Sequence, residues 1–188
     1  MQAKHQQGMG LVEVLVALLL LAIGILGFAL LQVRALNSSI EASKRVQAMG
    51  LAKDIAERIR ANQEGLTKDI ESAPDANGDK KIYKAYVEAF TGSESLSTYN
   101  YSTCFGTAVA CNSENFAKED AKQALYKAYQ MGMKVGLSQC AGTGIQRNRY
   151  CVYVAWDNTN PKDGSNDNDC SQNGNYRSDS KCIVMEAY

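Results

Sequence analysis

Residues 8–31 read GMGLVEVLVALLLLAIGILGFALL, and this stretch decides the architecture expected for the chain. Val14 to Leu31 contains no charged residue over 18 positions. That is about 27 Å of α-helix, close to the thickness of a bilayer core. A secretory signal peptide has its cleavage site beyond the apolar core. Here the plausible site follows Gly8, before the core, so cleavage would leave the apolar helix on the mature chain.

The carboxylate of Glu13 lies at the start of this expected helix. A carboxylate within a membrane helix costs about 2.5–3.5 kcal/mol on insertion scales, so its presence indicates a function. Its natural partner is an amine. The α-amino group of Met9, four residues earlier on the same helix face or on a neighbouring chain, could supply it. The competing interpretation is a carboxylate near the membrane surface whose side chain reaches water.

The order of Gly8, Met9, Glu13 and the apolar run resembles the class III leader of type IV pilins. The resemblance implies cleavage between Gly8 and Met9, N-methylation of Met9, and registration of neighbouring subunits by Glu13 during assembly. Met9-Gly10 departs from the Phe-Thr with which this family usually begins. An ordinary signal anchor is the alternative.

Two further segments are similar to the PilV family of minor pilins. They are IGILGFALLQVRALNSS at Ile23–Ser39 and LAKDIAERIRAN at Leu51–Asn62. The family resemblance implies an α+β pilin fold, in which a long N-terminal helix packs on a small antiparallel sheet. The pseudopilins of type II secretion share the run from Glu13 to Leu18, so that run alone does not separate the two families.

Apolar residues continue beyond Leu31 at mostly three- and four-residue steps, which predicts one helix from Met9 to Asn62, about 80 Å long. Gly24 and Gly27 would allow close helix packing or local unwinding, or would simply be tolerated in lipid. In the second half of the helix, the chain's own domain is expected to cover an apolar stripe. That stripe is Leu36, Ile40, Val46, Met49, Leu51, Ala52, Ile55, Ala56 and Ile59.

Two more helices and three strands are expected after residue 80. The helices are Lys81–Phe90 and Ser113–Gln130, the second with Phe116, Ala121, Ala124, Leu125 and Ala128 as its buried stripe. Gly132 would end it. Alternating residues predict strands at Met133–Leu137, Arg149–Trp156 and Lys181–Tyr188, arranged as an antiparallel meander, with Asp157–Asp179 as a long polar loop.

All six cysteines follow the apolar segment, and their number is even. This pattern favours disulfides in an oxidising compartment over a metal site, because no C-x-x-C pair is present. Six cysteines allow many connectivities. Sequential pairing is expected, because each bond would close a short loop or join adjacent strands: Cys104–Cys111, Cys140–Cys151 and Cys170–Cys182.

Composition argues against several classes of function. The 20 basic and 20 acidic residues balance, so nucleic acid is not a favoured partner. His5 is the only histidine and would leave with the leader, which excludes a Ser-His-Asp or Cys-His catalytic site in the mature chain. We expect no enzyme activity, cofactor or metal. Calcium binding by the acidic stretch 157–169 stays open.

Together these features predict four segments: a leader at 1–8, a membrane and filament-core helix at 9–33, an amphipathic half-helix at 34–62, and a periplasmic α+β domain at 63–188. The resemblance implies a minor pilin of the bacterial inner membrane that primes pilus assembly, lies at or near the filament tip and supports twitching motility. Expected partners are other minor pilins, the major pilin, the prepilin peptidase and the assembly platform. A type II secretion pseudopilin and a pilus-tip adhesin are the alternatives.

Overall fold

The computed structural model describes residues 10–66, 68–70, 81–83, 85–91, 95–99, 104, 111–141 and 149–187. It divides into two units, residues 1–43 and 44–188. One helix, α1 (Leu11–Ala61), contributes residues to both units. It is unbroken at Gly24 and Gly27, so no unwinding occurs there. The expected span from Met9 to Asn62 is confirmed within the described residues.

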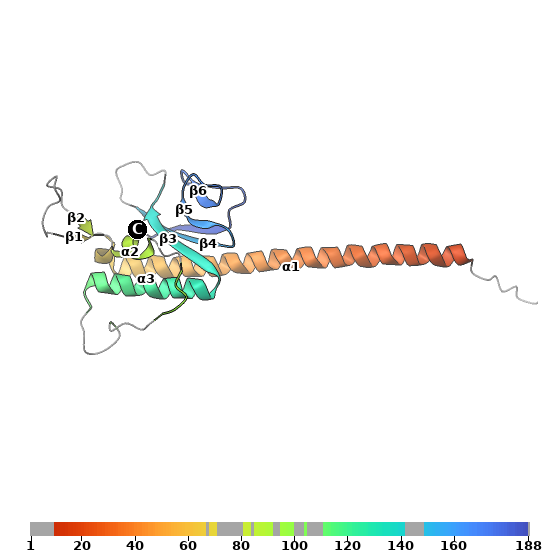
Figure 1. Ribbon diagram of the computed structural model, residues 1–188, viewed down its shortest axis with the longest axis horizontal. Coiled ribbons are helices and arrows are strands. Elements are labelled where there is room, and N and C mark those ends of the chain that lie inside the picture. Colours follow the sequence, from red (N-terminus) through yellow and green to blue (C-terminus); the bar gives the residue numbers. More distant parts are fainter. Residues whose placement is uncertain are drawn as a thin grey trace, which may run out of the picture. The chain divides into compact units, whose positions relative to one another are not determined.

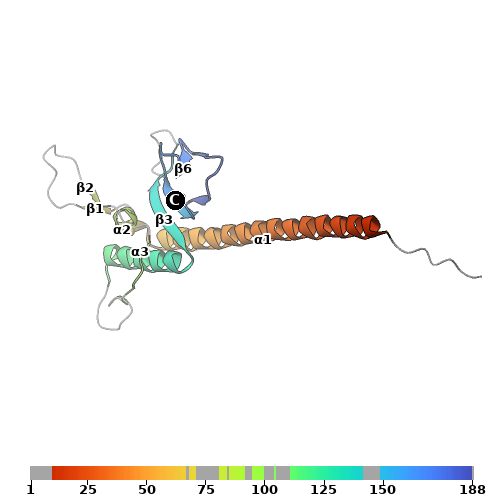
Figure 2. The ribbon, with the colours of Figure 1, turned by 45° about the vertical axis from the view of Figure 1, so that its right-hand side comes forward.

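The second unit is an α+β domain, as the sequence predicts. A 3₁₀ turn, η1 (Gln63–Gly65), follows α1, and the remaining helices are α2 (Ala85–Phe90) and α3 (Ser113–Gln130). The strands are β1 (Lys68–Ile70), β2 (Lys81–Tyr83), β3 (Met133–Gln139), β4 (Tyr150–Trp156), β5 (Asn160–Asp163), β6 (Asp169–Gln172), β7 (Asn175–Tyr176) and β8 (Cys182–Glu186). In two views α3 runs beside the C-terminal part of α1 (Figures 1 and 2).

The main sheet has the order β3-β4-β8, and both of its pairings are antiparallel. This is the expected meander. A second sheet has the order β5-β6-β7, with β5 and β6 parallel. β1 and β2 form a separate antiparallel pair. The stretch 157–179 is therefore not one long loop, as predicted, since it contains β5, β6 and β7.

The central strand β4 is buried on both faces. Tyr150, Val152, Val154 and Trp156 join the larger core with the helices, whereas Cys151, Tyr153 and Ala155 join a smaller core with Cys170 and Cys182. The predicted alternation of β4 is thus present, but its two faces enter two apolar cores instead of one core and solvent.

The buried stripe of α1 is shorter than predicted. It consists of Ala48, Leu51, Ala52, Ile55, Ala56 and Ile59. Leu36, Ile40, Val46 and Met49 are instead 48–71% exposed. The prediction included Ala52 and Ala56 but missed Ala48, and these three small side chains allow close packing of the helix.

Two further local predictions need correction. Phe116 was expected in the buried stripe of α3 but is 38% exposed, and Ala117 is buried in its place. The acidic residues Glu119 and Asp120 of α3 are also buried. The predicted helix Lys81–Phe90 begins only at Ala85, because Lys81–Tyr83 pairs with β1. α3 itself has the predicted bounds, and Gly132 follows it with a φ of 66°.

Candidate functional site

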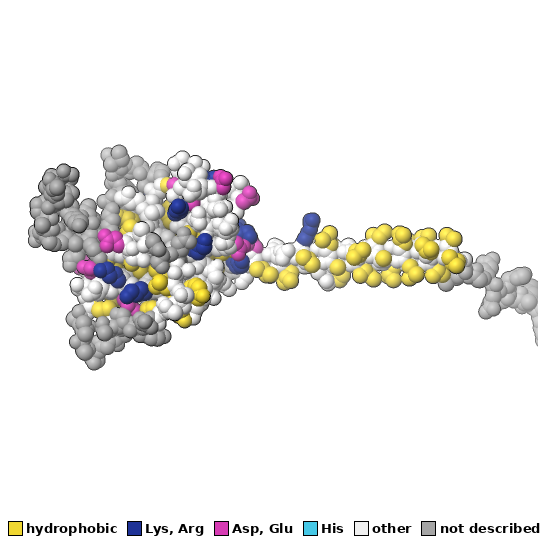
Figure 3. Space-filling view, viewed as in Figure 1, with side chains coloured by type: hydrophobic (Ala, Val, Ile, Leu, Met, Phe, Trp, Pro, Cys, Tyr) yellow, Lys and Arg dark blue, Asp and Glu magenta, His cyan; other side chains and the backbone are white. Residues whose placement is uncertain are grey.

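The N-terminal half of α1 exposes an apolar surface. An 18-residue window of this helix has a mean hydropathy of 3.1 and contains at most two charged residues, and none of the window is buried within the structure. Yellow hydrophobic side chains cover the visible side of this part of α1 in Figure 3. A helix that is apolar all round needs lipid or other protein around it. By length and composition α1 could cross a membrane.

Glu13 lies in the first turn of α1, where its backbone N–H donates to the carbonyl of Gly10 at 3.0 Å. Glu13 is exposed. Gly24 and Gly27 have open space where a Cβ would lie, so nothing in this chain requires glycine there. Gly8 and Met9, the expected cleavage site, lie outside the described residues.

A network of charged groups joins the C-terminal part of α1 to α3, and we call it the α1–α3 clamp: Asp54, Arg58, Tyr86, Asp120 and Lys127. Arg58 Nε donates to Asp54 Oδ1 at 3.0 Å, and Arg58 Nη1 donates to Asp120 Oδ1 at 2.7 Å. The Tyr86 hydroxyl donates to Asp120 Oδ2 at 2.8 Å, and Lys127 Nζ donates to Asp54 Oδ2 at 3.1 Å. Each buried charge of the clamp therefore has a partner.

The clamp shifts the pKa values of its own members. Burial would raise the pKa of Asp54, but the hydrogen bonds and charges of Arg58 and Lys127 outweigh it and lower that pKa. Burial would lower the pKa of Arg58, and the two aspartates raise it instead. The pKa of Tyr86 is raised by burial and by the neighbouring Asp120 carboxylate. All three shifts keep the charged groups charged and the tyrosine neutral at neutral pH.

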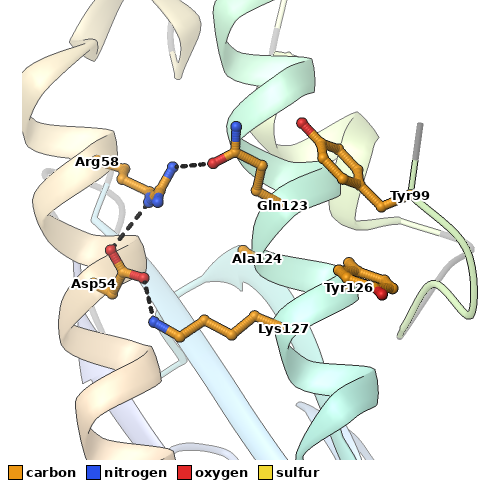
Figure 4. A pocket seen from close by; sticks show the side chains of 7 residues that line it. All are labelled: Asp54, Arg58, Tyr99, Gln123, Ala124, Tyr126 and Lys127. Carbon is orange, nitrogen blue, oxygen red and sulfur yellow. Dashed lines mark hydrogen bonds and ion pairs between the residues drawn. The ribbon is translucent and has the colours of Figure 1, made fainter. Parts of the chain in front are cut away.

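An open pocket of about 510 Å³ lies beside the clamp (Figure 4). Its polar wall is Asp54, Arg58, Gln123 and Lys127, and its apolar wall is Ala124 with Tyr99 and Tyr126, whose rings stack at 5.8 Å. Arg58 also donates to Gln123 Oε1 at 3.1 Å. The cations of this wall bind Asp54 and Asp120, so the wall joins α1 to α3.

The acidic stretch 157–169 does not gather its carboxylates. Asp157 pairs with Lys44 at 2.6 Å and with Lys181 at 2.7 Å. Asp163 accepts hydrogen bonds from a β6–β7 turn, and Asp169 accepts from Asn160 and from the N–H of Asn166. Among the described residues no group of three or more His, Cys, Asp or Glu side chains could hold a metal ion.

The six cysteines form three disulfides, Cys104–Cys111, Cys140–Cys151 and Cys170–Cys182. This is the sequential order expected from the sequence. The second and third bonds attach neighbouring segments to β4 and to β8. These two disulfides therefore hold the second, smaller core together.

Two protein-family models match the chain. Residues 3–29 match the prokaryotic N-terminal methylation motif, and residues 30–77 match the family described as type IV pilin Tt1218. The N-terminal region of this chain is therefore similar to that of type IV pilins. No curated protein and no solved structure matches the chain.

The pilin match and the exposed apolar surface of α1 are consistent with each other. Type IV pilins are structural subunits, so the match is to a non-enzymatic family. The methylation motif implies processing by a prepilin peptidase and assembly at a membrane, and the apolar half of α1 has the length and composition of a membrane anchor. Sequence reasoning did not identify Asp54, Arg58 and Asp120 as a network. The i,i+4 spacing of Asp54 and Arg58 was the available signal.

Proposed function

We propose that this chain is a PilV-like minor pilin that primes type IV pilus assembly and lies at or near the filament tip. The observation that carries the proposal is the apolar surface of α1. The chain itself leaves this surface uncovered over a length sufficient to cross a membrane, and the methylation motif at residues 3–29 overlaps α1. Such a surface suits a subunit that first lies in a bilayer and then packs against neighbouring helices.

Processing would occur between Gly8 and Met9, and the new N-terminus at Met9 would be methylated. Glu13 would then register the subunit against the Met9 amine of a neighbour, because an unpaired carboxylate is costly in an apolar filament core. Gly24 and Gly27 would give neighbouring helices room for close approach, since nothing in this chain fills the space beside them. Residues 9–33 would form the membrane and filament-core segment.

The surface for neighbouring subunits extends beyond Leu31 in this proposal. Leu36, Ile40, Val46 and Met49 are exposed apolar residues farther along α1, and each is at least 48% exposed. The sequence assigned these residues to the chain's own domain. As contacts for other minor pilins or the major pilin, they would bury apolar surface that otherwise faces water.

Before assembly the chain would span the inner membrane once, with residues 63–188 in the periplasm. Three disulfides suit that oxidising compartment. Its partners would be other minor pilins, the major pilin, the prepilin peptidase and the inner-membrane assembly platform, and its loss would impair twitching motility.

The experiment is a deletion strain in which surface pili are counted with filament retraction active and with retraction disabled, beside the profile of secreted proteins. A priming subunit raises the rate of initiation, so pili should disappear with retraction active and partly return without it. Complementation with the wild-type chain is the control. Normal pili with failed protein secretion would instead identify a type II secretion pseudopilin, and normal pili with normal secretion would reject both roles.

A further inference from the structure

The β6–β7 hairpin presents a fixed turn on the surface of the domain. Its two turn residues, Asn173 and Gly174, have φ values of 52° and 81°, which belong to the mirror-image turns that join tightly paired strands. The Asp163 carboxylate accepts hydrogen bonds from the backbone N–H groups of Asn173 at 3.1 Å and Gly174 at 3.0 Å, and from the Ser171 hydroxyl at 2.6 Å. The backbone that carries the side chains beside this turn therefore has a fixed conformation.

Tyr176, the last residue of β7, is exposed but held in place. Its hydroxyl oxygen accepts a hydrogen bond from the backbone N–H of Val184 at 2.8 Å, which joins the ring to β8. The residue is nevertheless 56% exposed. An aromatic ring that is anchored at its hydroxyl and open to solvent loses little conformational freedom when a ligand packs on it.

An open pocket of about 400 Å³ lies at this hairpin, and its lining is polar apart from the ring: Gln172, Asn173, Asn175, Tyr176, Arg177 and Ser178. Within the part of the chain that the structure describes, the side chains of Gln172, Asn173 and Asn175 make no hydrogen bond. Each amide group offers two donors and one acceptor. The pocket thus combines a fixed ring with several unused donors and acceptors.

The charge beside the pocket disfavours an anionic ligand. Arg177 lies in its lining, with Nη2 donating to the Gly164 carbonyl at 3.3 Å and Nη1 at 3.7 Å from the Asp167 carboxylate. Burial would raise the pKa of Asp163, but the hydrogen bonds that its carboxylate accepts and the positive charge of Arg177 outweigh burial and lower that pKa. Asp163 and Asp167 therefore offset the positive charge of Arg177, which weakens the attraction of the pocket for an anion.

We propose that this pocket binds an uncharged pyranose. A pyranose ring has a face of C–H groups that packs on an aromatic ring and a rim of hydroxyls that pair with amide groups. Tyr176 would take the C–H face, and Gln172, Asn173 and Asn175 would take the hydroxyls. This site goes beyond the role in assembly and does not depend on it, because none of its residues lies on α1.

The test uses the full chain purified in lauryldimethylamine oxide, a detergent without a sugar headgroup, on an array of immobilised neutral and acidic glycans. Binding to a subset of neutral hexose or N-acetylhexosamine glycans is expected, with little binding to sialylated or uronate-bearing glycans. Soluble methyl pyranosides of the bound sugars should compete. Tyr176→Ala should weaken binding by at least about tenfold, as expected for truncation of an aromatic anchor.

Tyr129→Ala is the matched control, because Tyr129 is 50% exposed on α3 and outside the pocket. It should bind like the wild type. Asn175→Ala is a second pocket variant that leaves the Tyr176–Val184 hydrogen bond in place, and it should also weaken binding. No binding to any neutral glycan, or stronger binding to acidic glycans, would overturn the proposal. So would binding at the wild-type level by both Tyr176→Ala and Asn175→Ala.

Discussion

Glu13 is one exposed carboxylate beside a surface that is otherwise apolar. In the proposed role its charge matters only when a neighbour brings an amine into the filament core. Glu13→Leu should therefore leave membrane insertion intact and reduce incorporation into filaments by at least about tenfold, the equivalent of about 1.4 kcal/mol. The measurement is the amount of this subunit in sheared filaments relative to the amount in the membrane fraction.

Glu41→Gln provides the control for Glu13, because it neutralises a carboxylate of α1 beyond the uncharged run. It should be incorporated like the wild type. Incorporation of Glu13→Leu at the wild-type level would reject the registration role, even if the subunit proved to be a pilin by other criteria.

Where α1 packs on α3, the α1–α3 clamp should make the stability of the domain sensitive to acid. The pKa of Asp54 is lower in the folded chain than in the unfolded one, so its stabilising contribution is present above about pH 4 and is lost as the pH falls through the folded-state value. Asp54→Asn should lower the free energy of unfolding by about 1 kcal/mol at pH 7, because the pair is partly exposed. The gap between variant and wild type should shrink below about pH 4.

Urea unfolding of the full chain in detergent can measure this gap, with the fluorescence of Trp156 as the probe. Trp156 is the only tryptophan and is 1% exposed. Asp167→Asn is the control, because the Asp167 side chain is fully exposed. A gap for Asp54→Asn that stays constant from pH 7 to pH 3, or an equal effect of Asp167→Asn, would contradict the clamp as the source.

The elements that the sequence predicts well are those with a long regular period. α1 and α3 have several turns each, and Asn112 caps α3 by accepting from the N–H of Asn115 at 2.8 Å. β5, β6 and β7 were missed because each has only two to four residues. Asn173-Gly174 was an available hairpin signal, but the residues beside it do not alternate between apolar and polar.

The candidate functional residues also differ in whether the local sequence predicts them. Glu13 is visible in the sequence because a carboxylate interrupts an apolar run. Arg58 and Asp120 are 62 positions apart, and their contact depends on how α3 packs beside α1. Gly136 is another such case: a Cβ there would lie 2.0 Å from the carbonyl oxygen of Pro161, a close approach between β3 and β5 that no local pattern records.

For the whole domain, the smaller core depends on covalent links. Cys170 and Cys182 are at most 6% exposed and close a loop with a sequence separation of 12, so loop closure alone stabilises the fold by about 3 kcal/mol. Replacing both by alanine should lower the free energy of unfolding by about 3 kcal/mol or more, because their sulfurs also fill part of that core. Thermal unfolding of the full chain in detergent measures the loss.

The double alanine variant of Cys104 and Cys111 is the matched control. This pair closes a shorter loop, with a separation of 7, and both residues are partly exposed, so its loss should cost about 2 kcal/mol. A larger loss for Cys104–Cys111 than for Cys170–Cys182 would show that the smaller core is not the part that depends on its disulfide.

The disulfides also bear on how such a chain could be exported. No loop closed by one bond contains a cysteine of another, so the three pairs follow one another along the chain. A domain that crosses a membrane in chain order, beginning with the residues next to its anchor, presents each cysteine directly before its own partner. An oxidase acting on consecutive cysteines as they emerge would produce the native set, and translocation could proceed without a disulfide isomerase.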